Sequence, residues 1–482
     1  MRTPPLPHQV DGTAWIKGPV PGRVAPAAAL FDIMGSGKSK QVVDAACELF
    51  EVKEINTVVV FCPAAVKFSW ADPDLGQVAQ HGWVPTVVVE LKSEGDFVPD
   101  TPGALTWVVV SYDWARSKRG LEKLRQELQG RKLLMVADES HRLGNHRAET
   151  TRVLTDLRDS LGGRGVLLSG TPMTNRYVLS LYSQFRWLDK RILPFQNFYH
   201  FRARFCQLGG PHNRVVLRYF DLDFLDRLLR PYVLRRTDVK LPKKTYQQFE
   251  VPLTPATWKL YREMRDEMVA WLSDQPGDQS VAVNGFEKIL RLAQLTSGIL
   301  GGLDGEDARE ISAEKNDFLL GWFRELKDLE EPVRFVVWCR FRPELPRLLR
   351  GVAALGIRGF RLAGGQSPRE REEAIREFQQ GDPGADAVLA AQPQAGGAGL
   401  NFSKCHREVF VSHVHALLDR QQAEDRLSRL DSVDQNLQIW DLLATGPAGQ
   451  KTIDHLILKN MRAGVELHRL TMAQWRKSLT EE

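Results

Sequence analysis

Short apolar runs rich in β-branched residues recur in the first part of the chain, and stretches of helical character separate them. An uninterrupted apolar strand has both faces buried, which is typical of a parallel sheet covered by helices on both sides. The sequence therefore predicts an α/β fold here. The runs begin at Thr57, Thr86, Trp107, Leu133 and Gly165.

The same alternation returns later, with apolar runs that begin at Val333, Asp386, Arg407 and Asn436. A chain of 482 residues is too long for one hydrophobic core, because single cores rarely grow past about 250 to 300 residues. We expect two α/β units in tandem, residues 1–240 and 241–482, with helical insertions at about 175–236 and about 254–329. The LPKKT stretch at 241–245 is expected to link them.

Within the second insertion, apolar side chains recur at helical spacing and predict core packing. They are Tyr261, Met264, Met268 and Leu272.

The composition is that of a folded protein, with 43% hydrophobic and 26% charged residues and a net charge of only +5. This charge permits an anionic partner without indicating one. No apolar stretch approaches the roughly 18 to 20 residues of a membrane span. The five cysteines are scattered without a CxxC pair, which indicates a reducing compartment. We expect a cytoplasmic protein, or a nuclear one if its source has a nucleus.

The stretch DIMGSGKS, residues 32–39, has the features of a phosphate-binding loop. Gly35 and Gly37 would let backbone N–H groups approach a phosphate at the start of a helix. Lys38 would reach the β and γ phosphates, and the Ser39 hydroxyl would hold Mg²⁺. Asp32 departs from the usual pattern, which has a glycine at that position. Alone, the stretch is also compatible with an ordinary glycine-rich turn.

A second signal is the apolar run LLMVAD, which stops at the carboxylates Asp138 and Glu139. A strand that ends there can deliver both groups to the carboxyl edge of the same sheet, where open α/β folds bind ligands. Asp138 would hold Mg²⁺ through water, and Glu139 would orient and deprotonate the attacking water. Two adjacent carboxylates at the end of a strand are usually just exposed to solvent. Their combination with the GSGKS stretch favours the catalytic interpretation.

In the second unit, positions 422, 426 and 429 are spaced by four and three residues, so a helix would place Gln422, Arg426 and Arg429 on one face. Arginines on a helix are usually solvated. Together with the other motifs, these two are candidate arginine fingers for a γ-phosphate. His413 and His415 lack a third ligand at suitable spacing, so we do not expect a metal site there.

The order of these motifs resembles that of the Swi/Snf-like ATPases of helicase superfamily 2, double-stranded DNA translocases with two RecA-like lobes. The resemblance covers nearly the whole chain. It includes two stretches characteristic of this family, LYSQFRWLD and LRPYVLRRTDVKLPKKT. The matching motifs, in chain order, are LPHQVDGTAWI, DIMGSGKS, VVVFCPAAVKFSW, VVSYDWARS, DESHRLGN, LLSGTPMTN, FVVWCRFRPEL, QAGGAGLNF, QAEDRLSRL and QKTIDHLILKNM.

The resemblance implies an α/β fold of two RecA-like parallel-sheet lobes, hydrolysis of ATP with Mg²⁺, and largely sequence-independent binding of double-stranded DNA. It also implies a C-terminal brace helix at about 451–476. The catalytic residues would be Lys38, Asp138, Glu139, Arg426 and Arg429, with Ser39 and Asp138 on the metal. Nucleotide would be bound by Gln9, Met34, Gly35, Ser36, Gly37, Lys38, Ser39, Gly399 and Gln422. DNA would be contacted by Lys67, Ser111, Tyr112, Thr171, Arg340 and Asn401.

The sequence departs from the family pattern at Ile33, Ser36 and Ser428, where Glu, Leu and His are usual. Two alternatives share the ATPase core: a strand-separating or branch-migrating helicase, and a subunit that uses ATP as a clamp within a larger complex. The absence of a histone-reading domain favours a bacterial or viral role in repair, replication or defence. The sequence does not reveal protein partners.

Overall fold

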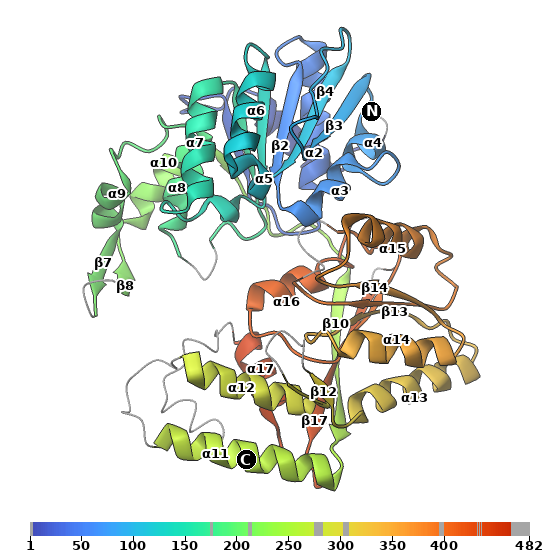
Figure 1. The fold of residues 1–482 in the computed structure, drawn as a ribbon. Coiled ribbons are helices and arrows are strands. Elements are labelled where there is room, and N and C mark those ends of the chain that lie inside the picture. The colour runs from blue at the N-terminus through green and yellow to red at the C-terminus, as the bar shows by residue number, and fades with distance from the viewer. Residues whose placement is uncertain are drawn as a thin grey trace. The chain divides into compact units, whose positions relative to one another are not determined.

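The computed structural model describes residues 3–173, 177–210, 215–273, 283–301, 308–394, 400–430, 432, 434 and 436–463. Two compact units divide the chain, with the main division between Leu241 and Pro242; Leu400 is also grouped with unit 1. Each unit contains one large parallel sheet flanked by helices (Figure 1). The predicted α/β class with two parallel sheets in tandem is therefore confirmed. None of the helices in the described part of the chain has the length and apolar character needed to span a bilayer.

The unit 1 sheet has the strand order β3-β4-β2-β5-β6-β1-β9, and every pairing is parallel. Its strands are β1 (Ala27–Leu30), β2 (Thr57–Cys62), β3 (Thr86–Leu91), β4 (Leu105–Ser111), β5 (Leu133–Asp138), β6 (Arg164–Leu168) and β9 (Val233–Leu234). Five of these are the apolar runs predicted from the sequence. The short β1 and β9 were not predicted, because an alanine-rich tetrapeptide and a dipeptide give no strand signal.

Helices cover both faces of this sheet. They are α1 (Pro7–Lys17), α2 (Lys38–Glu51), α3 (Lys67–Ala71), α4 (Gln77–His81), α5 (Tyr112–Arg116), α6 (Lys118–Leu128), α7 (Glu149–Leu161), α8 (Ser180–Leu188), α9 (Phe198–Phe205) and α10 (Leu222–Leu229), with the 3-10 turns η1 (Ala64–Val66) and η2 (Ser140–Leu143). Along β2, Val59 and Phe61 join the core under α5 to α8, whereas Val58 and Val60 join the core under α1 to α4. This alternation is the two-residue period of a strand, and it explains why the run is apolar throughout.

The insertion expected to be helical at about 175–236 also contains an antiparallel hairpin. Strands β7 (Cys206–Gly209) and β8 (Val215–Tyr219) form it next to α9. In Figure 1 this hairpin projects away from the sheet of unit 1.

The unit 2 sheet has the order β10-β17-β16-β13-β15-β14 and is also parallel. Its strands are β10 (Lys243–Pro252), β13 (Arg334–Trp338), β14 (Arg358–Leu362), β15 (Ala387–Ala391), β16 (Arg407–Phe410) and β17 (Asn436–Thr445). The LPKKT stretch was expected to be a linker, but its last three residues begin β10. The reason is tertiary: β10 pairs with β17 over ten residues, from Lys243 with Asn436 to Pro252 with Thr445.

The helices of unit 2 are α11 (Pro255–Ser273), α12 (Val283–Thr296), α13 (Glu314–Asp328), α14 (Glu344–Ala354), α15 (Pro368–Gln380), α16 (Leu417–Glu424) and α17 (Ile453–Arg462), with a small hairpin of β11 (Ile299–Leu300) and β12 (Arg309–Glu310). Tyr261 and Met268 of the predicted apolar stripe are buried, in one core with α12 and α17. The Leu272 side chain lies outside the description. Of the brace helix expected at about 451–476, the described part is α17.

Candidate functional site

Three chain segments leave the unit 1 sheet side by side at its carboxyl edge. Leu168, the last residue of β6, is in register with Leu30 at the end of β1 and with Asp138 at the end of β5. The phosphate-loop candidate, the two carboxylates and the SGTP segment therefore begin in one row. This is the edge at which parallel α/β sheets bind ligands.

The loop between β1 and α2 has the backbone needed to receive an anion. Gly35 and Gly37 have φ angles of 79° and 75°, a region that only glycine adopts without strain. Gly37 directly precedes α2, which has no side-chain cap and no acidic residue in its first turn. The Lys38 Nζ donates to the carbonyl oxygens of Asp32 and Ile33, at 2.9 and 3.0 Å, and so lies over the loop. The start of α2 and the Lys38 ammonium together make this loop electropositive, which suits an anion.

Asp32, which replaces the usual glycine, is fully buried and is held by an arginine from the far end of unit 1. The Arg236 guanidinium donates to Oδ1 of Asp32 at 3.2 Å and to Oδ2 at 2.9 Å, and the Arg236 amide donates to Oδ1 at 2.9 Å. The amide of Ile33 in turn donates to the Arg236 carbonyl at 3.1 Å. Arg236 therefore anchors the start of the loop. Sequence reasoning missed it, although it lies in the family-like stretch LRPYVLRRTDVKLPKKT.

Asp138 is oriented by two donors that fix both of its carboxylate oxygens. The Trp70 Nε1 donates to Oδ2 at 2.8 Å, and the Glu139 amide donates to Oδ1 at 2.9 Å. Burial, followed by the charge of Glu139, raises the pKa of Asp138 to about 6, while the Trp70 hydrogen bond and Lys38 oppose this rise. The carboxylate is thus ionised at neutral pH but close to its titration range. Trp70 is a second residue that the sequence did not reveal.

Glu139 has a strained backbone. Its φ of 51° and ψ of 52° are left-handed, a conformation that costs a non-glycine residue on the order of 1 kcal/mol. The Glu139 Oε2 lies 3.4 Å from the Nδ1 of His141. Strain of this kind is concentrated at functional sites.

The remaining nucleotide candidates of unit 1 surround the same loop. The Gln9 side chain is buried, and its Oε1 accepts a 2.9 Å hydrogen bond from the Leu6 amide, which caps α1. The Ser36 carbonyl lies 3.0 Å from the Nε2 of His8. Ser39 is partly exposed in the first turn of α2, and Met34 packs against Gly170. Contact of Gln9 with adenine remains a prediction.

Most of the predicted DNA-contact residues in unit 1 make internal interactions. Lys67 forms an ion pair with Glu90. Ser111 is buried and caps α5 by accepting a 3.2 Å bond from the Trp114 amide. The buried Tyr112 hydroxyl donates to the Asp138 carbonyl oxygen at 2.8 Å. Burial, followed by the charge of Asp138, raises the pKa of Tyr112. The Thr171 amide donates to the Ser169 hydroxyl at 3.1 Å.

In unit 2, Arg340 follows β13. Its amide donates to the Ser412 hydroxyl at 2.6 Å, and its guanidinium donates to the His413 carbonyl at 3.2 Å. Burial lowers the pKa of Arg340 to about 10, so it stays charged at neutral pH. The Asn401 Oδ1 accepts a 2.9 Å bond from the Ser403 amide. Contact of Arg340 and Asn401 with DNA remains a prediction.

The prediction that Gln422, Arg426 and Arg429 share one helical face is wrong. Gln422 lies on α16, but this helix ends at Glu424, and both arginines lie in the turns that follow. The Arg426 carbonyl accepts from the Phe402 amide at 2.9 Å, and the Arg429 amide donates to the Ser432 hydroxyl at 3.0 Å. The bond from the distant Phe402 occupies the Arg426 carbonyl, which a continued helix would bond to an amide four residues further along. Gly399 lies outside the described residues.

His413 is a core residue of unit 2. Its Nε2 lies 3.2 Å from the Leu442 carbonyl oxygen, and burial lowers its pKa to about 4. Over the described part of the chain, no three His, Cys, Asp or Glu side chains gather in a way that could hold a metal ion. A magnesium ion does not require such a cage, since it usually binds one or two carboxylates together with substrate phosphates. Asp138 and the Ser39 hydroxyl supply suitable oxygens.

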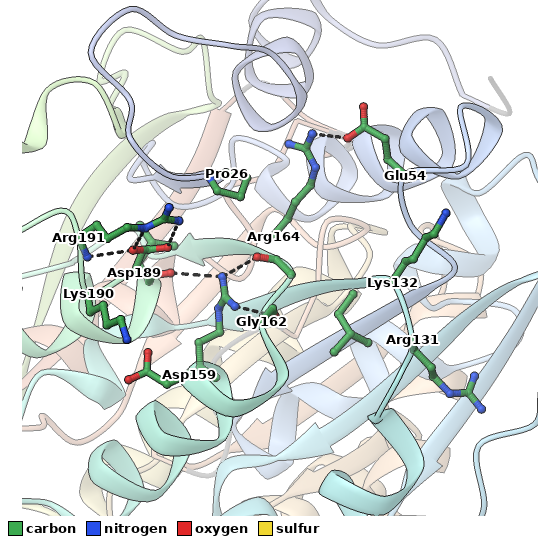
Figure 2. Close-up of a pocket in the computed structure, with 14 residues that line it drawn as sticks. Pro26, Glu54, Arg131, Lys132, Asp159, Gly162, Arg164, Asp189, Lys190 and Arg191 are labelled. Atoms are coloured by element: carbon green, nitrogen blue, oxygen red, sulfur yellow. Dashed lines mark hydrogen bonds and ion pairs between the residues drawn. The ribbon is translucent and has the colours of Figure 1, made fainter.

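A cavity of about 640 Å³ lies at the opposite, amino edge of the unit 1 sheet (Figure 2). Its basic lining suggests an anion site, but four of its cations bind backbone carbonyls at or just past the ends of helices, and Arg191 pairs with the Asp189 carboxylate. Such capping neutralises the negative ends of helix dipoles, so we assign these side chains a structural role. Arg131 binds the carbonyl of Glu127 at the end of α6, Arg158 those of Gly162 and Gly163 after α7, Lys132 that of Lys53 after α2, and Arg164 that of Lys17 in α1.

Comparison with known proteins identifies the family of this chain. The family model described as "SNF2-related domain" matches residues 8–297, more than half of the chain. The chain belongs to the SNF2-related family. The Swi/Snf-like resemblance predicted from the motifs is thereby confirmed.

Relatives of this SNF2-related chain are distant and longer. An "Uncharacterized ATP-dependent helicase" of Mycoplasma pneumoniae is 23% identical over 98% of the chain and 43% of the relative. A "SWI/SNF-related matrix-associated actin-dependent regulator of chromatin subfamily A-like protein 1" of Drosophila melanogaster is 24% identical over 88% of the chain and 51% of the relative. The chain spans about half the length of these curated relatives.

Among solved structures, a Sulfolobus solfataricus SWI2/SNF2 ATPase core in complex with dsDNA matches 97% of this chain and 93% of that one, with 19% identity and a TM-score of 0.42.

Proposed function

We propose that this SNF2-related protein is an ATP-dependent translocase on double-stranded DNA. The observation that carries the proposal is the convergence of the Lys38 loop, Asp138 and Glu139 at one edge of the unit 1 sheet. Family membership and the relative from Mycoplasma pneumoniae, named as an ATP-dependent helicase, support ATP as the substrate. The duplex substrate is the one that the sequence resemblance implies.

The residues of unit 1 would divide the chemistry among themselves. The helix start at Gly37 and the Lys38 ammonium would bind the phosphates. Asp138 and Ser39 would hold Mg²⁺, which neutralises phosphate charge when bound. Glu139, fixed by its left-handed backbone, would orient the attacking water and accept its proton. Electrostatic stabilisation and positioning account for most of the catalysis in reactions of this class.

Unit 2 would supply the cations that complete the reaction. We propose Arg426 and Arg429 for the charge that develops on the γ-phosphate, a role worth on the order of 10³ to 10⁵ in rate. Because Arg426 is held by its backbone bond to Phe402, its position depends on the last residue of the motif QAGGAGLNF. Repeated closure and release around ATP would move the protein along the DNA backbone, without reading sequence.

The experiment is ATP hydrolysis measured with duplex, single-stranded and forked DNA, and without DNA. We expect duplex DNA to stimulate turnover most strongly. Lys38→Ala should abolish turnover together with nucleotide binding. Glu139→Gln should lower turnover by about 10² or more while ATP still binds. Glu149→Gln, an exposed carboxylate at the start of α7, is the control that should leave turnover unchanged.

Each alternative has its own outcome in this experiment. Equal turnover with and without nucleic acid would contradict the translocase. Stronger stimulation by forked than by duplex DNA would favour a strand-separating or branch-migrating enzyme. Binding of ATP with negligible turnover in the presence of DNA would favour a clamp subunit.

A further inference from the structure

The side-chain amide of Gln184, on α8, joins two segments that leave neighbouring strands of unit 1. Its Oε1 accepts a 2.8 Å hydrogen bond from the Ser140 hydroxyl, and its Nε2 donates a 2.7 Å bond to the Pro172 carbonyl. Ser140 directly follows Glu139 in the chain, and Pro172 lies in the SGTP segment after β6. One planar group therefore connects the carboxylate turn with that segment.

This amide lies in an apolar environment. Gln184 and Ser140 are both fully buried, and the α8 neighbours Phe185, Trp187 and Leu188 belong to the hydrophobic core. A buried amide stabilises the fold only if its oxygen and its amino group are both bonded. Packing alone would be served better by leucine or methionine at this position, so the polar side chain points to a role for the two hydrogen bonds themselves.

At one end of this connection stands the strained backbone of Glu139. Its left-handed conformation persists only if the surrounding structure holds it, and the next residue in the chain is anchored by Gln184. A shift of the Ser140 side chain would therefore move the Glu139 carboxylate, the group proposed to activate water.

At the other end stands a segment that touches the nucleotide loop and includes a proposed DNA contact. A Cβ added to Gly170 would come within 2.3 Å of the Met34 side chain, so this part of the segment packs directly on the loop. Thr171, which follows, is the residue proposed to contact the DNA backbone. Binding at Thr171 would displace Pro172 first, because the two are adjacent in the chain.

We propose that Gln184 is a positioning residue that transmits DNA contact at the SGTP segment to the Glu139 turn, and so couples DNA binding to ATP hydrolysis. The inference rests on the proposed function. Gln184 does not touch nucleotide in this scheme. It acts by holding Ser140 and Pro172 at a fixed distance from each other, so that a movement of one displaces the other.

The test compares ATP hydrolysis with and without duplex DNA in the wild type, Gln184→Met and Gln184→Glu. Methionine keeps the length but removes the bonds to Ser140 and Pro172, together with a weaker 3.3 Å bond from Nε2 to the Ser180 carbonyl of the same helix. Glutamate keeps an acceptor for Ser140 and removes the donor to Pro172. We expect the stimulation by DNA to fall about fivefold or more in both variants. The KM for ATP should stay within about twofold, because the nucleotide loop is untouched.

The matched control is Ser183→Ala, on the neighbouring residue of the same helix. The Ser183 hydroxyl is buried and donates a 3.2 Å bond to the Gly144 carbonyl, so the variant also loses a buried hydrogen bond of α8. The hydrogen bond that it removes reaches neither Ser140 nor Pro172, so the variant should keep full stimulation. Ser140→Ala combined with Gln184→Met should be no worse than Gln184→Met alone, because both remove the same connection.

Full stimulation in Gln184→Met would overturn the inference and leave the proposed function intact. An equal loss in Ser183→Ala would also overturn it, because the effect would then follow helix stability. A wild-type protein whose turnover does not respond to duplex DNA would overturn the proposed function, and the coupling role with it.

Discussion

The carboxylate of Asp32 and the guanidinium of Arg236 are joined by two hydrogen bonds across 204 positions of sequence. Asp32 opens the nucleotide loop after β1, and Arg236 follows β9, which pairs with β1. The pair thereby ties the loop to the last strand of unit 1. It also explains why an aspartate is tolerated where phosphate loops usually have glycine.

Replacement of Arg236 by alanine should destabilise unit 1 and loosen the loop. The variant leaves the buried Asp32 carboxylate without its guanidinium partner, which typically costs about 3 to 5 kcal/mol. Urea unfolding and nucleotide binding would measure the two effects. Arg186→Ala, which breaks a two-bond pair with the more exposed Asp159, is the control and should cost about 1 kcal/mol or less. Equal losses in the two variants would contradict the anchoring role.

The raised pKa of Asp138 predicts that magnesium binding weakens below about pH 6, which we call the acid limit. Below about 6 the carboxyl group is protonated and loses the charge that the metal needs, so the Mg²⁺ concentration for half-maximal turnover should rise about tenfold per pH unit. The free energy of unfolding depends on pH in the opposite direction to magnesium binding. A carboxyl pKa raised from 3.8 favours the folded state at low pH, and this contribution is lost as the pH rises through 6.

Trp70→Phe supplies the matched test of that pH dependence. The Trp70 hydrogen bond lowers the pKa of Asp138, so its removal should move the acid limit to higher pH. The measurement is the Mg²⁺ dependence of turnover from about pH 5 to about pH 8. An unchanged limit in Trp70→Phe would show that another group controls it.

Gly170→Ala should weaken nucleotide binding more than it weakens the fold. The new methyl group would press on the Met34 side chain and come within 3.2 Å of the Met34 amide, so the nucleotide loop must move. Crowding of this kind costs about 1 to 3 kcal/mol, and we expect a severalfold higher KM for ATP. Steady-state kinetics would show it. Gly95→Ala, whose methyl would meet no atom closer than 3.8 Å, should have wild-type kinetics.

The ion pair of Lys67 with Glu90 predicts opposite effects of two neutralising substitutions on DNA affinity. If Lys67 contacts a phosphate, Lys67→Gln should weaken binding and reduce the salt dependence by about one charge. Glu90→Gln should strengthen binding, because it removes the competing carboxylate. Fluorescence anisotropy with duplex DNA at several salt concentrations would measure both. Weakening by both substitutions would indicate a structural pair instead.

The elements that the sequence predicted best are those defined by local pattern. In an apolar run such as LLMVAD, the side chains on both faces of the strand must be buried. A parallel sheet covered by helices meets this need, and these strands were confirmed. Gly35 and Gly37 were likewise predictable, because a left-handed backbone strongly favours glycine. The end of α16 at Glu424 was not predicted; just beyond it, the Arg426 carbonyl is bonded to the amide of the distant Phe402.

By itself, the sequence determined the two parallel sheets, the order of their motifs and the groups that we propose to carry the chemistry. Only the tertiary structure decided which partners hold those groups: Arg236 for Asp32, Trp70 for Asp138 and Gln184 for Ser140. The reason is physical. Strand and turn propensities depend on a few adjacent residues, whereas a buried polar side chain is satisfied by whichever donor or acceptor the packed chain brings within about 3 Å.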